Sequence, residues 1–199
     1  MSKLLYAVSA LVIFISASAQ AETKVPERIL GKANAPITVL EYVSFTCSHC
    51  ADFTNTVLPE LEKKYIETGK VRFILVDFPL DGSSLKAALL ARCMPEEQFY
   101  PFVKVLFSNM KQWATSTNVE QTLLQYAKLG GLSEEKGKTC LKNTGHMDAI
   151  VAKRKAAGDK YEIDSTPTFI INDGKEKVVG LRKAEEFGAI FDKLLNAKR

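Results

Sequence analysis

The chain is poor in the residue types that mark many specialised protein classes. Its 199 residues include seven prolines, eleven glycines, four cysteines, two histidines and one tryptophan. This composition excludes collagen-like and low-complexity architectures, and no internal repeat with a solenoid period is present. Hydrophobic residues make up 46% of the chain and charged residues 25%, as in ordinary globular proteins. The length fits one domain that can bury a full core, with room for an inserted subdomain.

A strong charge bias is also absent. The formal net charge is +4, and the basic residues are spread along the chain rather than gathered in a block with interleaved aromatic residues. Nucleic acid is therefore not expected as a partner.

Long hydrophobic runs are scarce, and the one near the start is short. Lys3 precedes an almost wholly apolar stretch, Leu4–Ile15, and small residues then lead to Ala19-Gln20-Ala21. A membrane-spanning helix needs about 20 apolar residues, so this run is too short for an anchor. A basic start, an apolar centre and a small-residue end are typical of a secretory signal peptide. We therefore expect residues 1–21 to direct export and to be removed, so that the mature chain begins at Glu22.

The first half of the mature chain alternates between strand and helix patterns. Ile37–Val43 and Val71–Asp77 are short apolar runs that predict buried strands. A helix is expected between them, over about residues 50–64, because apolar residues recur there at four-residue intervals, and Pro59 should bend it. The order strand, helix, strand predicts a parallel pair with a right-handed crossover.

Only helical periodicity is present from residue 83 to about residue 158. The expected helices include one through Phe99 to Met110, one that starts after Asn118, one that starts after Ser133 and a last one that ends near Gly158.

Strand character returns near the C-terminus. Thr168–Ile171 is followed by a turn at Asn172-Asp173-Gly174, by Val178-Val179, and by a closing helix that contains Phe187 and Leu194. We therefore predict an α/β sheet domain over residues 22–82 and 159–199, interrupted by a helical insert over residues 83–158.

The clearest chemistry belongs to Cys47-Ser48-His49-Cys50, at the junction of the first strand and the first helix. Free backbone N–H groups and the helix dipole favour an anion at Cys47, which lowers a thiol pKa. A protonated His49 would add a second favourable charge. Cys50 lies one turn further in and should be less exposed. Cys47 is therefore expected as the nucleophile and Cys50 as the resolving thiol.

Two other interpretations of this pair exist. The cysteines could form a purely structural disulfide, or they could supply half of a zinc site together with His49. Zinc needs further ligands, and only Cys93, Cys140 and His146 remain. We therefore expect no metal, and we expect His146 and Trp113 to be ordinary core or surface residues.

Glu41 is an acidic residue inside an otherwise apolar strand. Burial of an unpaired carboxylate is costly unless it is protonated or hydrogen-bonded, so its presence there points to a function. The alternative is that it lies at a strand edge and reaches solvent.

The remaining cysteines, Cys93 and Cys140, both fall in the helical insert. In an oxidising compartment they are expected to form a structural disulfide, and two buried free thiols are the alternative.

Two stretches resemble the DsbA-like thiol:disulfide oxidoreductases of the thioredoxin superfamily. Val39–Cys50 is similar to their active-site region, and Ser165-Thr166-Pro167-Thr168-Phe169 resembles their cis-proline loop. The helical insert matches in position and size, so the resemblance covers essentially the whole mature chain. It implies a thioredoxin-like fold with an inserted helical subdomain.

The resemblance also implies roles for site residues. Thr166 and Pro167 would be joined by a cis peptide bond facing the cysteine pair and would bind extended substrate peptides together with Ser48, which stands where many members have proline. Glu41 would exchange a proton with Cys50.

The function implied is that of a periplasmic dithiol oxidase. Such a protein passes the Cys47–Cys50 disulfide to reduced, unfolded exported proteins through a mixed disulfide, needs no cofactor, and is re-oxidised by a membrane quinone reductase of DsbB type. A disulfide isomerase or reductase is the first alternative, and a non-catalytic, chaperone-like peptide-binding module is the second. Related isomerases add an N-terminal dimerisation segment, and only about fifteen residues separate Glu22 from the first strand, so a monomeric oxidase is favoured.

Overall fold

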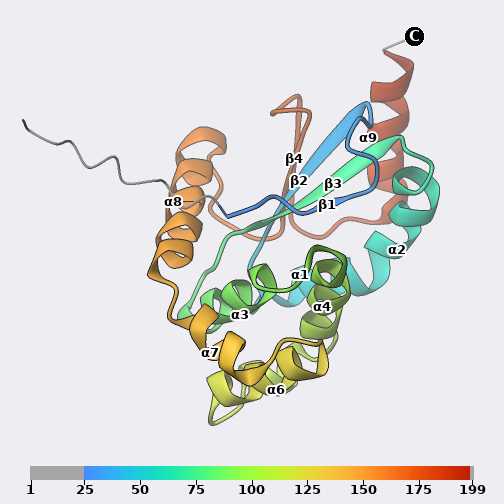
Figure 1. The fold of residues 1–199 in the computed structure, drawn as a ribbon. Helices are drawn as coiled ribbons and strands as arrows, with labels where there is room; N and C mark the ends of the chain where they lie inside the picture. Colours follow the sequence, from blue (N-terminus) through green and yellow to red (C-terminus); the bar gives the residue numbers. More distant parts are fainter. Residues whose placement is uncertain (1–24, 198–199) are drawn as a thin grey trace, which may run out of the picture.

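The computed structural model describes residues 25–197, and the expected signal peptide, residues 1–21, lies outside this range. In the described range five strands form one mixed sheet in the order β1-β3-β2-β4-β5. These strands are β1 (Ile29–Leu30), β2 (Ile37–Val43), β3 (Val71–Asp77), β4 (Thr168–Ile171) and β5 (Glu176–Val179). Figure 1 shows the sheet between α8 (Thr144–Tyr161) on one side and α9 (Ala184–Asn196) on the other.

Strand pairing places β2 at the centre of the sheet. β2 runs parallel to β3, with Ile37 opposite Val71 and Val43 opposite Asp77, so the predicted parallel pair is confirmed. On its other side β2 pairs antiparallel with β4, and β4 pairs antiparallel with β5. The edge strand β1, antiparallel to β3, was not predicted because two residues in a polar segment carry no periodicity.

The helix after β2 is not a regular α-helix. Its path runs through α1 (Ser48–Asp52), the π-helical η1 (Phe53–Val57), α2 (Leu58–Leu61) and the π-helical η2 (Glu62–Ile66). Pro59 lies in the first turn of α2, where a missing N–H is best tolerated. The chain therefore accommodates the proline by widening the turn before it, and π-helical turns of this kind often occur at functional sites.

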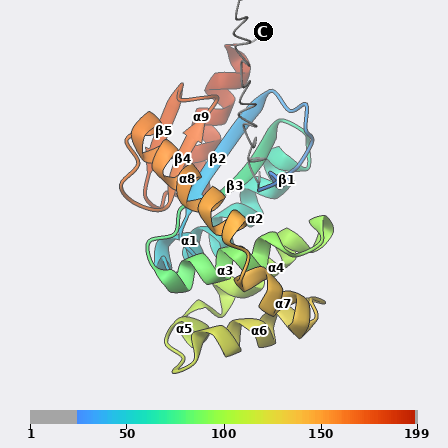
Figure 2. The same ribbon diagram turned by 60° about the vertical axis from the view of Figure 1, so that its left-hand side comes forward.

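The long helical segment consists of several short helices that gather below the sheet (Figure 2). They are α3 (Gly82–Arg92), α4 (Glu96–Ser108), α5 (Met110–Ala114), α6 (Val119–Leu129) and α7 (Glu134–Leu141). The predicted starts are confirmed, because the side chains of Asn118 and Ser133 cap α6 and α7.

Two helix boundaries differ from expectation. Met110 begins a separate helix, because the chain leaves helical geometry at Asn109. The last helix of the segment runs through Gly158 to Tyr161 and ends where Glu162 adopts a left-handed conformation with φ 52°. Gly158 therefore lies inside α8, a position that costs a helix only about 1 kcal/mol relative to alanine.

The interior is filled by two large hydrophobic clusters. One lies between the sheet and α9, and the other fills the helical end of the molecule. Trp113 belongs to the second cluster and is fully buried, with its Nε1 donating to the Leu106 carbonyl at 2.8 Å. Cys50 also lies in this cluster. The start of α1 is thus anchored in the core of the helical end.

None of the helices within residues 25–197 has both the length and the apolar character that a membrane crossing requires.

Candidate active site

The junction of β2 and α1 builds the candidate site. Cys47 is the N-cap of α1, with φ −86° and ψ 119°, and its Sγ accepts a hydrogen bond from the backbone N–H of Cys50 at 3.4 Å. Cys47 is half-buried, whereas Cys50 is fully buried. Both are free thiols, so the structure describes the reduced pair. A reagent from outside can therefore reach Cys47 far more readily than Cys50.

The two thiols differ sharply in acidity. The hydrogen bond with the Cys50 side chain does most to lower the pKa of Cys47, from 9.0 to about 5, with further contributions from Thr166 and from the backbone N–H groups of Cys50 and His49. Burial raises the pKa of Cys50 far above its ordinary value, and the hydrogen bond to Cys47 and the nearby Glu41 raise it further. At neutral pH the pair therefore holds a thiolate at Cys47 and a protonated thiol at Cys50.

His49 contributes to the acidity of Cys47 through its main chain. Its side chain is exposed, and its backbone N–H is one of the groups that lower the pKa of Cys47. The favourable charge expected from a protonated ring stays a prediction.

A second loop faces the cysteine pair. The peptide bond between Thr166 and Pro167 is cis, and the thiol form of Cys47 donates to the Thr166 carbonyl at 3.2 Å. The pairing of β4 with β2, which sets Thr168 opposite Tyr42, brings this loop to the end of β2. Pro167 is buried, Thr166 is half-buried and Ser48 is exposed beside the thiols. The expected substrate-binding residues are thus gathered around Cys47.

Glu41 lies on the central strand and is completely buried. The alternative, that Glu41 lies at a strand edge and reaches solvent, is wrong, because β3 and β4 flank β2 on both sides. Neither carboxylate oxygen has a hydrogen-bond partner among the described residues. Burial, followed by the negative charge of Cys47, raises the pKa of Glu41 well above 4.5. Glu41 therefore carries a proton that it can exchange with a nearby group.

The surroundings of Glu41 were not predicted. Glu41, Thr54 and Tyr100 contribute to the wall of a cavity of about 630 Å³ between β3 and α4. Thr54 Oγ1 is buried without a partner in the described range. Thr54 lies one helical turn beyond Cys50, which is a spacing that could have identified it, whereas Tyr100 comes from a distant helix and left no local signal.

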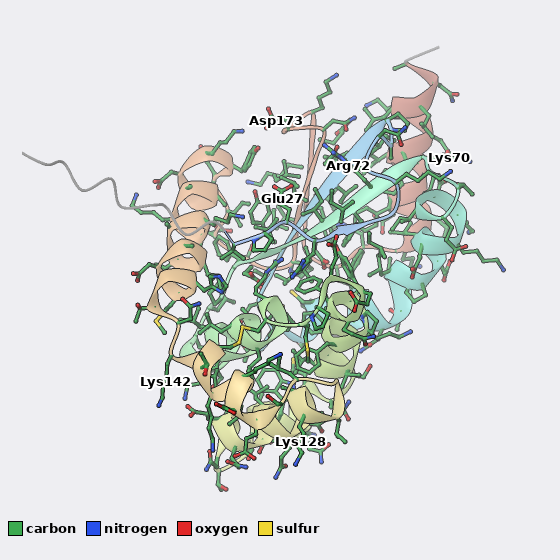
Figure 3. All side chains as sticks on the ribbon, in the orientation of Figure 1. Glu27, Lys70, Arg72, Lys128, Lys142 and Asp173 are labelled. Carbon is green, nitrogen blue, oxygen red and sulfur yellow. A yellow bond between two sulfur atoms is a disulfide. The ribbon has the colours of Figure 1, made fainter. Side chains whose placement is uncertain are left out.

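The other two cysteines are joined to each other. Cys93, at the end of α3, and Cys140, in α7, form a disulfide with an S–S distance of 2.03 Å (Figure 3). The structure therefore has one disulfide in the helical segment and not two free thiols there. Across residues 25–197 no three histidine, cysteine, aspartate or glutamate side chains cluster in a way that could hold a metal ion.

Comparison with known proteins defines the family. A family model described as thioredoxin matches residues 23–193. The chain belongs to this family. Its thioredoxin-like α/β fold, predicted from the sequence, is confirmed.

Solved structures extend the likeness to DsbA-like proteins. The crystal structure of α-DsbA1 from Wolbachia pipientis is 36% identical, with a TM-score of 0.79 over 86% of this chain and 92% of that chain. BdbD from Bacillus subtilis, in its oxidised form, is 26% identical, with a TM-score of 0.75 over 85% of this chain and 93% of that chain. The resemblance to the DsbA-like family is therefore confirmed.

Curated relatives carry names of the same kind. A putative protein-disulfide oxidoreductase from Rickettsia felis is 32% identical over 147 residues, which cover 73% of this chain and 53% of that relative. Disulfide bond formation protein D of Bacillus subtilis is 28% identical over 155 residues, which cover 73% of this chain and 67% of that protein. The chain spans about half the length of the rickettsial relatives it matches.

Proposed function

We propose that this protein is an exported dithiol oxidase that donates the Cys47–Cys50 disulfide to reduced, unfolded proteins. The observation that carries the proposal is the asymmetry of the pair, with an acidic, half-buried Cys47 and a protonated, buried Cys50. The names of its DsbA-like relatives support the same chemistry.

Reaction begins at the accessible sulfur. A substrate thiolate attacks Cys47 Sγ, a mixed disulfide forms, the Cys47–Cys50 bond breaks, and Cys50 leaves as a thiolate. The pKa of Cys50 is strongly raised, so this thiolate takes up a proton, and the buried Glu41 is positioned to supply it.

The second step releases the substrate. Another substrate thiolate attacks the substrate sulfur of the mixed disulfide, which expels Cys47. A thiolate with a pKa of about 5 is a good leaving group. The substrate loses two electrons and two protons. The enzyme gains the two electrons and the proton that Glu41 gives to Cys50. One of the two substrate protons restores Glu41 by way of solvent, and the other stays in solvent.

The cellular setting belongs to the same proposal. The signal-like N-terminus supports export to the periplasm, and a membrane quinone reductase of DsbB type would re-oxidise the pair. We propose that the enzyme works as a monomer without a cofactor. An isomerase or reductase would use the same atoms, and a peptide-binding module would use only the surface around Thr166 and Ser48.

Trapping of mixed disulfides tests the roles of the two thiols. Cys50→Ala should accumulate mixed disulfides with disulfide-containing substrate proteins, because the Cys47 thiolate attacks the substrate disulfide, expels one substrate thiolate, and no resolving thiol remains to release the other. Cys47→Ala should accumulate none. Equal trapping by the two variants on non-reducing gels would refute the assignment.

A second assay separates catalysis from simple binding. A redox-active pair should accelerate the reduction of insulin by dithiothreitol, and the Cys47→Ala variant should not. If the wild-type protein gives no acceleration, the chaperone-like alternative replaces the oxidase.

A further inference from the structure

The three residues between β2 and Cys47 are held by side chains from the start of α3. Ser84 Oγ accepts hydrogen bonds from the backbone N–H of Phe45 at 2.8 Å and from Ser44 Oγ at 2.9 Å. Ser44 and Ser84 are both almost completely buried. Ser84 thus supplies the partner that a neighbouring strand would otherwise give to this stretch of backbone.

The next residue, Thr46, is hydrogen-bonded to the carboxylate of Asp81. Thr46 Oγ1 donates to Asp81 Oδ2 at 2.5 Å, and Asp81 Oδ1 accepts from the backbone N–H of Ser84 at 2.8 Å. Asp81 is also the N-cap of α3. One side chain therefore caps a helix and fixes the residue that precedes Cys47.

The hydrogen bonds of Ser84 and Asp81 to residues 44–46, here called the clamp, set the conformation of Cys47. The backbone N–H of Cys47 donates to the Ser44 carbonyl at 3.0 Å, so Cys47 is tied to the clamped loop from its N-terminal side. The extended N-cap conformation of Cys47 then directs Sγ toward the Cys50 N–H at 3.4 Å, a donor that stabilises the thiolate. A small rotation of the loop would lengthen this hydrogen bond.

We propose that Asp81, acting through Thr46 and together with Ser84, is a positioning residue that holds Cys47 in its thiolate-stabilising geometry. The proposal rests on the proposed role of Cys47 as the sulfur that forms the mixed disulfide. It adds that the start of α3, in the helical segment, controls the reactivity of a cysteine that follows the central strand of the sheet.

An effect of the Asp81 charge and an effect of its geometry would shift the pKa of Cys47 in opposite directions. If Asp81 acted on Cys47 only through its negative charge, removal of the carboxylate would favour the thiolate and lower the pKa of Cys47. If Asp81 acts by positioning, loss of its contact with Thr46 weakens the hydrogen bond from the Cys50 N–H to Sγ and raises that pKa. Thr46→Val breaks the contact without a change of charge, so it isolates the geometric effect.

The test is a titration of the reduced protein, followed by the ultraviolet absorbance of the Cys47 thiolate. Thr46→Val should raise the midpoint by about half a unit to one unit, which is the size expected for the weakening of one hydrogen bond. The equilibrium constant for oxidation of glutathione by the pair should fall about three- to tenfold with it. Thr46→Ser, which keeps the hydroxyl, should restore the wild-type midpoint, and Asp81→Ala, which removes both carboxylate contacts, should shift it upward.

Ser133→Ala provides the matched control. It removes the cap of α7, as a change at Asp81 removes that of α3, but Ser133 has no contact with the Cys47 loop. Ser133→Ala should lower the melting temperature and leave the midpoint unchanged. If Thr46→Val lowers only the melting temperature, or if Ser133→Ala shifts the midpoint equally, the positioning role is refuted. The titration can be read even if trapping experiments refute the oxidase, so the two failures are distinguishable.

Discussion

The chemistry of the site depends on two buried residues, Cys50 and Glu41, which are buried for different reasons. Cys50 is buried because it lies one helical turn beyond the N-cap, whereas Glu41 is buried because its strand is central in the sheet. Burial raises the pKa of each of these two side chains above its ordinary value. The site therefore keeps protons available beneath the half-buried thiolate of Cys47.

Replacement of Glu41 by glutamine should change the pH dependence of stability. Because the folded pKa of Glu41 is raised above 4.5, the folded state retains a proton that the unfolded state loses. The contribution of Glu41 to the stability of the wild-type protein should therefore fall as pH rises above 4.5, by about 1.4 kcal/mol per pH unit until the folded pKa is reached. Glu41→Gln should lack this component.

Denaturant unfolding of the reduced proteins at a series of pH values checks the effect. The exposed Glu97 on α4 gives a matched control, and Glu97→Gln should follow the wild-type curve. Parallel curves for the wild type and Glu41→Gln would contradict the raised pKa.

Residue-level prediction succeeded where the signal was local. The positions of Cys47 and Cys50 follow from a strand that runs directly into a helix, and both could be read from adjacent residues. The Ser44–Ser84 contact could not, because its partners are 40 positions apart. Such a contact depends on tertiary packing, which sequence periodicity does not report.

The disulfide between Cys93 and Cys140 operates at the scale of elements, because it ties α3 to α7. Its cysteines are 47 positions apart, and closure of a loop of that length stabilises a protein by about 4 kcal/mol in the chain-entropy model. Replacement of both by alanine should lower the melting temperature and leave catalysed insulin reduction nearly intact. An unchanged melting temperature, or a large loss of insulin reduction, would contradict this division of roles.

The sequence identified the longer elements and missed the finer ones. β2, β3 and β4 have the predicted bounds, because each is an apolar run between turn residues. The π-helical turns η1 and η2, the two-residue β1 and the break at Asn109 were not predicted. These features arise where packing against neighbours overrides local preference, and Pro59 was the only local sign that the first helix would be irregular.

At the scale of the whole molecule, the cysteine pair lies where the sheet meets the helical end. Cys50 and Phe45 belong to the core of the helical end, and the ring of Phe45 stacks on that of Phe107 with centroids 5.1 Å apart. Phe53, three residues after Cys50, belongs to the core between the sheet and α9. Both cores therefore support the short segment that carries the thiols, so the redox state of the pair should be coupled to global stability.

This coupling has a predictable sign. The folded pKa of Cys47, about 5, is lower than its ordinary value of 9.0, so the thiolate stabilises the folded, reduced protein. The contribution is complete above pH 9.0, is partly present at pH 7, and is lost as pH falls through 5. At pH 7 it amounts to about 1–2 kcal/mol once solvent screening of the half-exposed sulfur is included.

The free energies of unfolding of the oxidised and reduced proteins, measured by denaturant titration between pH 7 and pH 4, test the oxidase proposal most directly. An oxidase should be more stable when reduced, because transfer of its disulfide to a substrate then releases free energy. The reduced protein should be the more stable form at pH 7, and the difference should shrink as pH falls toward 5 and the Cys47 thiolate is protonated. An oxidised form that is more stable at pH 7 would contradict the proposal and would indicate a reductase or a purely structural disulfide.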